Sequence, residues 1–558
     1  MGKQSREKWE KRDETNEKSS GALAFRSGLE KTCLFIIRWG TYLVLFAPLI
    51  INTKFFFPFV APKTIFFRIV VEVILAAYVF LLMKNKNYRP MINALTIAVV
   101  LFVGIFILAS FTGINLHRSI WSTNERMTGV FTMLHLLAFF IVLTSTFKAR
   151  KDWEKILGVS VIGGVLLSLY ILTGQETSTR GGGTIGNTSF MAAYLLFGVF
   201  FAVILFLSKR GAWRIFSGIS LAAMLPVLFN SSARGAVGAF WGGLFLLGLG
   251  YMAFSQKKIL QRISLAIVLV MLTSVIALAV FQPPFVKAGV ATFLNNMVPR
   301  FAVWSEGWKG FLERPILGWG PENFIVVFSK YFKPCMFSSC GGEIWFDRVH
   351  NIVLDTLVTT GVVGLLSYLA IFGVAIYGLL RSVPKITERR HIFFPLGLSV
   401  LLLAYFFQNL FVFDMINTYL LFFLSLGFGS FLMQHPAEER EVSPRRINPV
   451  LGSLVLIAAV FVFWMGNVQP LMANRSLIKT VEAKDLGGAT SFFKKSLNSW
   501  MEKYEPREYF TQKMMGGIDP SIKGKEREAF QVAFDLAESE MAKGVKQNYL
   551  DFRPRLFL

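Results

Sequence analysis

The sequence is poor in charge, cysteine and histidine. Only 16% of its 558 residues are Asp, Glu, Lys or Arg, and it contains three cysteines and five histidines. Low charge together with 54% hydrophobic residues excludes a disordered chain and is atypical of a soluble domain. Three cysteines are too few for a disulfide-rich scaffold. Cys33 borders an apolar run, while Cys335 and Cys340, in CMFSSC, can pair only on an oxidising side of a membrane.

Several catalytic motifs are missing as well. The sequence has no Walker A motif, no G-x-S-x-G, no H-E-x-x-H and no C-x-x-C. These absences argue against P-loop, serine-hydrolase, zinc-peptidase and thiol-redox chemistry. Cys335, Cys340 and the nearby His350 fall short of the four ligands of a structural zinc site. We therefore expect neither a metal nor a cofactor.

Long apolar runs dominate what is present. A mean hydropathy of +0.53 is typical of a polytopic membrane protein, and runs of about 20 residues are long enough to cross the hydrocarbon core. We predict an all-α polytopic integral membrane protein with about 12–13 transmembrane helices. The runs lie near 33–52, 64–83, 91–110, 128–147, 153–173, 185–208, 212–230, 235–254, 261–281, 352–379, 392–411, 415–433 and 449–467.

Basic residues are distributed unequally between the two sets of loops. With a cytoplasmic N-terminus, the short inner loops carry nineteen Lys and Arg residues, and the outer loops at 53–63, 111–127, 174–184 and 231–234 carry six. The positive-inside rule then predicts a multi-pass protein of the cytoplasmic (inner) membrane. This bias and attraction to anionic membrane lipids account for much of the net charge of +24, with no nucleic acid as partner.

Three regions follow from this pattern. Residues 1–32 lack the apolar core of a cleavable signal peptide and are expected to form a basic cytoplasmic tail. Residues 33–467 form the membrane domain, with a large outer loop at 282–350 whose Trp304, Trp308 and Phe311 recur at helical spacing and predict an interfacial helix. Residues 468–558 are expected outside the membrane as two or three short helices, one of them amphipathic over 526–543.

Six arginines and one histidine lie on loops predicted to face outward, where positive charge is disfavoured. A sparse cationic set on that side indicates a site for an anionic substrate, because guanidinium groups bind phosphate bidentately. The residues are Arg118, Arg126, Arg180, Arg234, Arg300, Arg348 and His350.

Arg234 lies in SSARGA, a tight turn between two spans. An unpaired guanidinium at membrane depth is costly, so Arg234 either reaches the lipid headgroups or binds a substrate diphosphate. The small neighbouring residues leave room for a ligand and favour binding of a substrate diphosphate. Arg180 opens RGGGTIGN, which is equally typical of a backbone anion nest and of a flexible loop. Arg126 stands beside Glu125, so a surface ion pair explains it as well as binding does.

The hexapeptide FDRVHN, at 346–351, combines Asp347, Arg348, His350 and Asn351 just before a span. Histidine exchanges a proton near neutral pH, which makes His350 a candidate general base. A lone interfacial histidine is more often structural. The adjacent arginine and the large preceding loop favour a catalytic role for His350 over a structural one.

Four motifs in succession resemble the O-antigen ligase / Wzy superfamily of bacterial envelope proteins. They are RGGGTIGNTSFMAAYL, NSSARGAVGAF, RFAVWSEGWKGFLERPILGWGPENF and FDRVHNIVLDTLVTTGVVGLL, within a similarity that covers about residues 110–430. The resemblance implies a GT-C-like, metal-independent membrane glycosyltransferase. Such enzymes move a glycan from an undecaprenyl diphosphate carrier to an acceptor on the outer face of the membrane.

The resemblance also assigns roles to residues. Arg234 and Arg300 match the arginines expected to bind the carrier diphosphate, and His350 matches the essential histidine proposed as general base. Arg126 and Arg180 are expected to add to the cationic site. Arg348 and Asp347 flank the histidine, and Arg348 is a further candidate for diphosphate binding.

The acceptor stays open at this stage. A ligase transfers to a glycolipid, a polymerase to another carrier-linked glycan, and a protein O-oligosaccharyltransferase to Ser or Thr of a protein. A transporter of polyprenyl-linked glycans is the alternative from a different class. It would need charged residues throughout the bundle, but Arg68 and Glu72 are spaced i, i+4 and predict a local ion pair.

Overall fold

The computed structural model describes residues 28–174, 181–281, 283–338, 340, 345–434, 448–499, 502–517 and 524–547. Within these ranges the chain forms helices and no strand. Twelve of the helices in them are long and apolar enough to cross a membrane, and another apolar helix has 17 residues. The protein is an all-α polytopic membrane protein, and the predicted fold class is confirmed.

The apolar helices follow the predicted runs in order. The first begins at Gly28 instead of residue 33, and residues 1–27 of the expected tail lie outside the described residues. The helices are α2 (Gly28–Val44), α3 (Ala61–Lys84), α4 (Ala94–Thr112), α6 (Val130–Thr146), α7 (Arg150–Leu172), α8 (Thr188–Ser208), α9 (Ala212–Asn230), α10 (Arg234–Ala253), α11 (Lys258–Phe281), α14 (Ile352–Ser382), α15 (Phe393–Asn409), α16 (Ile416–Met433) and α17 (Pro449–Phe463).

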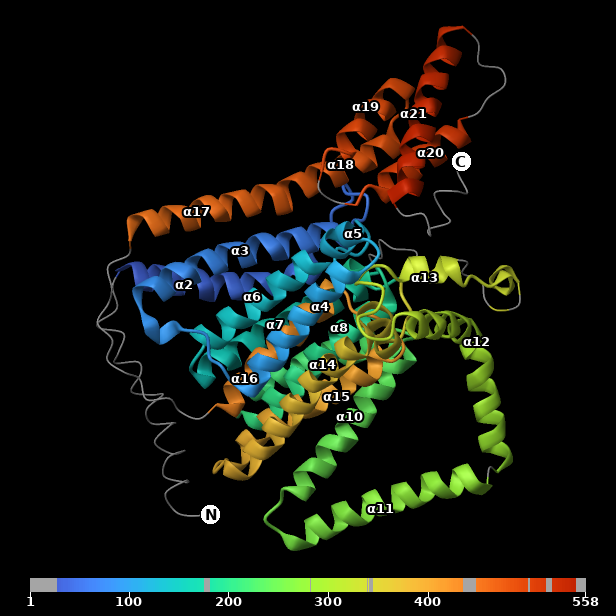
Figure 1. Ribbon diagram of the computed structural model, residues 1–558. Coiled ribbons are helices and arrows are strands. Elements are labelled where there is room, and N and C mark those ends of the chain that lie inside the picture. Colours follow the sequence, from blue (N-terminus) through green and yellow to red (C-terminus); the bar gives the residue numbers. More distant parts are fainter. Residues whose placement is uncertain are drawn as a thin grey trace.

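Three helices, α8, α15 and α16, form the centre of the bundle (Figure 1). The most apolar 18-residue stretches of α8 and α16 are each 83% buried, and that of α15 is 72% buried. Their sequences are apolar on every face, which is the pattern of a helix surrounded by other helices. Phenylalanine rings such as Phe197, Phe200 and Phe201 fill the space between them.

Two helices lie at the periphery. In the corresponding stretches of α11 and α17 only 6% and 11% of the residues are buried. Figure 1 shows α11 running away from the bundle after α10, and α17 lying along α3. Exposed helices rich in Leu, Ile and Val are stable where lipid surrounds them, because all backbone hydrogen bonds are made within the helix.

The segment between α11 and α14 is largely helical. It contains α12 (Pro284–Glu313) and α13 (Phe324–Lys330), and Cys335 is disulfide-bonded to Cys340. The predicted helix around Trp304 lies in the second half of α12, which bends in Figure 1 and has Pro299 inside it. A proline inside a helix removes a hydrogen bond and bends the axis. The bend turns Arg300 and the residues after it toward the bundle.

Helix α14 opens at Gly361, where φ is 68°. The opening leaves the carbonyls of Val358 and Thr359 without their helical donors, and the N–H groups of Trp319 and Gly320 donate to them at 2.9 Å each. In return the N–H groups of Val362 and Val363 donate to Pro315 and Ile316. The loop before α13 is therefore fixed to α14 by four backbone hydrogen bonds, which satisfy two carbonyls and two N–H groups of the opened helix.

The C-terminal unit has four helices, where two or three were predicted. Helix α17 continues through a π-helical turn at Trp464–Val468 into α18 (Gln469–Glu482), followed by α19 (Leu486–Ser496), α20 (Tyr504–Gly516) and α21 (Lys525–Gln547). The expected amphipathic helix over 526–543 lies within α21, and its Ala533, Ala537 and Met541 are buried. In Figure 1 this unit stands at the end of the bundle where α5 (Leu116–Trp121) lies.

The predicted ion pair between Arg68 and Glu72 is wrong. Arg68 donates instead to the Thr132 hydroxyl and to the Met127 carbonyl, which holds the loop that follows α5. Glu72 pairs with His135 of α6 at 2.9 Å and accepts from Asn467 of the π-helical turn at 2.7 Å. Arg68 and Glu72 thus take their partners from other segments of the chain and not from each other. Ionisable groups within a membrane protein usually face the interior of the bundle and pair there.

Candidate active site

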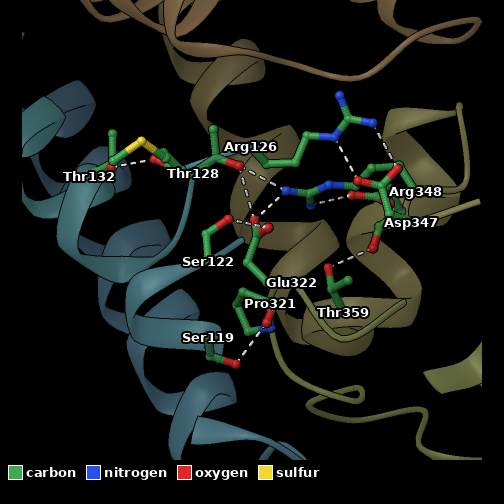
Figure 2. A network of polar contacts seen from close by, with 12 residues as sticks. Ser119, Ser122, Arg126, Thr128, Thr132, Pro321, Glu322, Asp347, Arg348 and Thr359 are labelled. Atoms are coloured by element: carbon green, nitrogen blue, oxygen red, sulfur yellow. Dashed lines mark hydrogen bonds and ion pairs between the residues drawn. The ribbon is translucent and has the colours of Figure 1, made fainter. Parts of the chain in front are cut away.

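Three loops meet at one end of the bundle, and the carboxylate of Glu322 joins them (Figure 2). It accepts hydrogen bonds from the hydroxyls of Ser122, at 2.7 Å, and Thr128, at 3.1 Å, in the loop after α5. The guanidinium of Arg348 donates to the same carboxylate from the loop before α14. Glu322 is only 7% exposed, so these bonds form where water cannot compete.

A second ion pair joins two of the same loops. Arg126 donates to both carboxylate oxygens of Asp347, at 2.6 and 2.9 Å, in a bidentate arrangement. Burial alone would raise the pKa of the Asp347 carboxyl, but the Arg126 guanidinium outweighs it and holds that pKa well below its usual range. Asp347 is therefore fully ionised at neutral pH, and the charge of Arg126 is compensated.

His350 follows Arg348 by two residues and stands just before α14. Its Nδ1 lies 3.0 Å from the carbonyl oxygen of Arg348. A carbonyl only accepts, so Nδ1 carries the proton and the unprotonated Nε2 faces away with its lone pair. The rings of Phe346 and Phe413 pack edge-on against the imidazole, with centroids 5.4 and 5.0 Å away. Burial lowers the pKa of His350 most. The hydrogen bond to the Arg348 carbonyl and the charge of Asp347 raise that pKa, and the charges of Arg126 and Arg300 lower it.

Arg300 and Arg234 differ from the other arginines of the site. In the described part of the chain neither has a carboxylate within ion-pair distance. The Arg300 guanidinium lies 5.9 Å from the Phe411 ring, and burial lowers the pKa of this group. Arg234 is exposed at the first position of α10, and the adjacent Gly235 lies against Gln408 and Phe411. Arg300 and the residue next to Arg234 thus both lie near Phe411, in the loop after α15.

The remaining arginines have other surroundings. Arg118 is buried, 3.8 Å from Glu502 and 5.2 Å from the Tyr504 ring, so it connects α5 to the C-terminal unit. Arg180 lies outside the described residues. The glycines that follow it begin a short 3₁₀ turn, Gly183–Ile185, directly before α8. The ring of Phe190 in α8 packs on Phe413, so this turn lies at the same end of the bundle.

Backbone strain is concentrated at these loops. The non-glycine residues of the described chain with positive φ are Ser122, Met127, Ser232, Glu322 and His350. Each lies in one of the loops that carry the candidate residues, and His350 itself has φ 57°. Such conformations cost on the order of 1–3 kcal/mol each and persist only where surrounding contacts hold them. The strained residues thus lie at the same end of the bundle as the candidate residues.

Some residues around the site were not recognised as candidates in the sequence. Glu322 stands in a GWGPEN run that reads as a helix break, and Asp355, 3.4 Å from Arg348, lies inside an apolar run. A carboxylate at membrane depth was the available clue for Asp355. Phe411 and Phe413 had no clue, because only the fold places them against Arg300 and His350.

Fold and site together define a polytopic membrane protein with a histidine and uncompensated arginines at one end of its bundle. A family model described as O-antigen ligase matches residues 219–369. The match confirms the resemblance to the O-antigen ligase / Wzy superfamily and supports an O-antigen ligase- or polymerase-type membrane enzyme. It contains Arg234, Arg300 and His350, whereas Arg126 and Arg180 precede it. No curated protein matches the chain.

Proposed function

We propose that this protein transfers a glycan from an undecaprenyl diphosphate carrier to a hydroxyl group of an acceptor. The observation that carries the proposal is the state of His350. Its Nδ1 donates to the Arg348 carbonyl, its Nε2 is left as a base, and an uncompensated arginine lies close enough to lower its pKa. A base beside cationic groups suits a reaction that removes a proton and releases an anion.

The reaction is a single displacement at the anomeric carbon. The acceptor hydroxyl attacks that carbon while Nε2 of His350 takes its proton. The bond between the anomeric carbon and the phosphate oxygen breaks, and its electron pair stays on the carrier diphosphate. The configuration inverts, and no covalent intermediate with the protein forms. The protonated imidazole then releases its proton to water.

The departing diphosphate needs positive charge, and Arg234 and Arg300 are the groups proposed to supply it. Guanidinium groups in a low-dielectric site stabilise a leaving anion without a metal. Arg180 stays a further candidate from the sequence. Arg126 and Arg348 were also predicted to bind the diphosphate, but their pairing with Asp347 and Glu322 favours a positioning role. We expect transfer to persist when divalent cations are removed with EDTA.

The proposed orientation places the site outside the cytoplasmic membrane. The loops at the opposite end of the bundle hold most of the basic residues, including Lys148, Lys209 and Arg389, which the positive-inside rule assigns to the cytoplasm. The C-terminal unit packs on the site loops, since the Asn124 N–H donates to Glu505, and would also lie outside. Labelling of a cysteine introduced at Ser232 by a membrane-impermeant reagent in intact cells tests this.

Purified protein in lipid with a defined carrier-linked glycan provides the test of function. His350→Ala should abolish transfer while carrier binding persists, because the base acts only on the acceptor. Arg234→Ala and Arg300→Ala should weaken carrier binding as well. Arg475→Ala, at an exposed position of α18, is a matched control expected to behave as wild type. Full transfer by His350→Ala would refute the proposed base.

The acceptor and the transporter alternative are separated by the product formed. A glycolipid, a second carrier-linked glycan and a Ser/Thr peptide should be offered in parallel. A covalent conjugate with any one of them identifies the acceptor class. Movement of the intact carrier across the membrane, with no conjugate, would instead identify a transporter and refute glycan transfer.

A further inference from the structure

One peptide group just before α14 is hydrogen-bonded at both ends. It joins Arg348 to Val349, and its carbonyl oxygen accepts from Nδ1 of His350 at 3.0 Å. Its N–H group donates to Oδ1 of Asp355 at 3.2 Å. Because a peptide group is planar, a bond that fixes its N–H also fixes the direction of its carbonyl. Asp355 is therefore connected to the imidazole of His350 through a single peptide group.

Asp355 also holds the backbone on both sides of the histidine. Its carboxylate binds the N–H of Val349, one residue before His350, and its own N–H donates to the carbonyl of Asn351, one residue after, at 2.8 Å. His350 has φ 57°, a conformation that costs on the order of 1–3 kcal/mol and persists only where surrounding contacts hold it. The bond to Asn351 is part of α14 and does not depend on the side chain. The bond to Val349 is made by the carboxylate alone.

The bond between Asp355 and Val349 is shielded from water. Asp355 is 6% exposed and Val349 is fully buried. The other carboxylate oxygen lies 3.4 Å from the guanidinium of Arg348, which has Glu322 as a further partner. Replacement of Asp355 thus leaves Arg348 paired, whereas the N–H of Val349 loses its acceptor. A buried N–H without a partner costs about 1–3 kcal/mol, so this peptide group would be the first to change direction.

We propose that Asp355 is a positioning residue for His350, which acts by orienting the peptide group between Arg348 and Val349. The oriented carbonyl keeps the proton of the neutral imidazole on Nδ1 and leaves Nε2 as the base. In serine proteases an aspartate holds the tautomer and the direction of the catalytic histidine by direct contact. Here one peptide group stands between the two side chains. The inference rests on the proposed function, because it assigns Asp355 to the base of that reaction.

The tautomer of His350 can be measured without any transfer reaction. Solid-state NMR of the full-length protein in lipid, with isotopically labelled histidine, distinguishes protonated from unprotonated ring nitrogens at about pH 8, where the imidazole is neutral. The loss of a signal in His350→Ala assigns it to this residue. We expect one tautomer, protonated at Nδ1, in the wild type and a mixture of both in Asp355→Ala. A single Nδ1-protonated tautomer in both proteins would overturn the proposal.

Transfer kinetics test the same role by a second measurement. A general base contributes about 10²–10⁴-fold, so Asp355→Ala should lower kcat about tenfold or more and leave KM for the carrier-linked donor unchanged. Thr356→Val is the matched control in the same turn of α14, since its buried hydroxyl donates to the carbonyl of Ile352 within the helix. It should behave as wild type. A raised donor KM with unchanged kcat in Asp355→Ala would overturn the positioning role.

Asp355→Asn is the conservative variant, and it keeps the proposal testable if Asp355→Ala does not fold. Its amide oxygen can still accept from the N–H of Val349, so the Nδ1-protonated tautomer and most of kcat should be retained. A mixture of tautomers in folded Asp355→Asn would overturn the proposal.

The two measurements also separate this inference from the proposed function. A protein that transfers nothing, but whose His350 changes tautomer in Asp355→Ala, would refute glycan transfer and support the positioning role. Transfer that depends on His350 and is the same in wild type and Asp355→Ala would refute the positioning role alone.

Discussion

Glu322 is the residue on which the site loops depend most. Its buried carboxylate accepts from Ser122, Thr128 and Arg348, which belong to two other loops. Removing one member of a buried ion pair takes away part of its partner's compensation, and here it leaves Arg348 with the carboxylate of Asp355, 3.4 Å away. The effect is larger than the loss of a single neutral hydrogen bond.

We therefore predict that Glu322→Gln lowers stability by about 3–5 kcal/mol and removes transfer. Ser122→Ala, which removes one neutral donor to the same carboxylate, should cost only about 1 kcal/mol. Thermal unfolding in detergent and the transfer assay measure both effects. Equal melting temperatures for the two variants would contradict the central role of Glu322.

The pH dependence of transfer follows from His350. A base acts in its unprotonated form, and burial lowers the pKa of this imidazole below its ordinary value of 6.5. We predict that kcat/KM rises with pH through a midpoint below 6.5 and is on its plateau at neutral pH. A midpoint above 6.5 would contradict the observed surroundings of His350.

Arg300 provides an internal check of that midpoint. Its positive charge disfavours the imidazolium, so Arg300→Gln should raise the midpoint of the pH profile. The shift should appear in addition to weaker donor binding. Arg475→Gln removes a charge from an exposed position of α18, outside the site loops, and should leave the midpoint where it is in the wild type.

At the scale of elements, the opening of α14 determines where the Glu322 loop lies. Gly361 has φ 68°, and a Cβ atom there would lie 2.1 Å from the Ile316 carbonyl oxygen. The same contact region contains the backbone bonds that fix residues 315–320 to the helix. A side chain at this position meets backbone atoms, which cannot rotate away.

We predict that Gly361→Ala displaces the loop before α13 and removes transfer, with a loss of stability of at least about 1–3 kcal/mol from the backbone conformation alone. Gly373→Ala in the same helix is the matched control, since a Cβ there meets no atom within 4 Å. The control should be neutral or slightly stabilising. Activity in Gly361→Ala equal to that of Gly373→Ala would contradict the prediction.

For the whole molecule, the contact between the C-terminal unit and the membrane domain is pH-sensitive. Glu505 accepts from the backbone N–H of Asn124 at 2.7 Å. Burial raises the pKa of Glu505 to about 7, and the neighbouring Glu502 raises it while Arg118 lowers it. Because the folded protein holds the proton of Glu505 more tightly, the contribution of this group to stability is fully present below the ordinary pKa of 4.5 and is lost as the pH rises through about 7.

Glu505→Gln should therefore flatten the dependence of the melting temperature on pH between 4.5 and 7. Burial also raises the pKa of Glu306 to about 7, with the same sign, so part of the dependence remains. The difference between wild type and variant in the slope of melting temperature against pH gives the contribution of Glu505 alone. Identical slopes for the two proteins would contradict the proposed contribution.

Much of the architecture was predictable from composition. An apolar run of about 20 residues is stable in lipid as a helix, because a helix makes all backbone hydrogen bonds within itself. All thirteen predicted runs are helices in the structure. Arg234, Arg300 and His350 could be chosen as candidates because their residue types are unusual beside a membrane. The pairing of Arg126 with Asp347, 221 residues later, could not be predicted from the sequence, because side-chain partners depend on how distant loops pack.

The sequence by itself determined the membrane class, the order of helices and the chemical groups available to the site. Its apolar periodicity and scarce charges are local properties, and local rules are sufficient to interpret them. The tertiary structure alone decided which arginines have a carboxylate beside them to compensate their charge. Asp347 and Glu322 compensate Arg126 and Arg348, while Arg300 and Arg234 have no carboxylate beside them among the described residues. That division follows from the meeting of loops far apart in the chain, which no local pattern encodes.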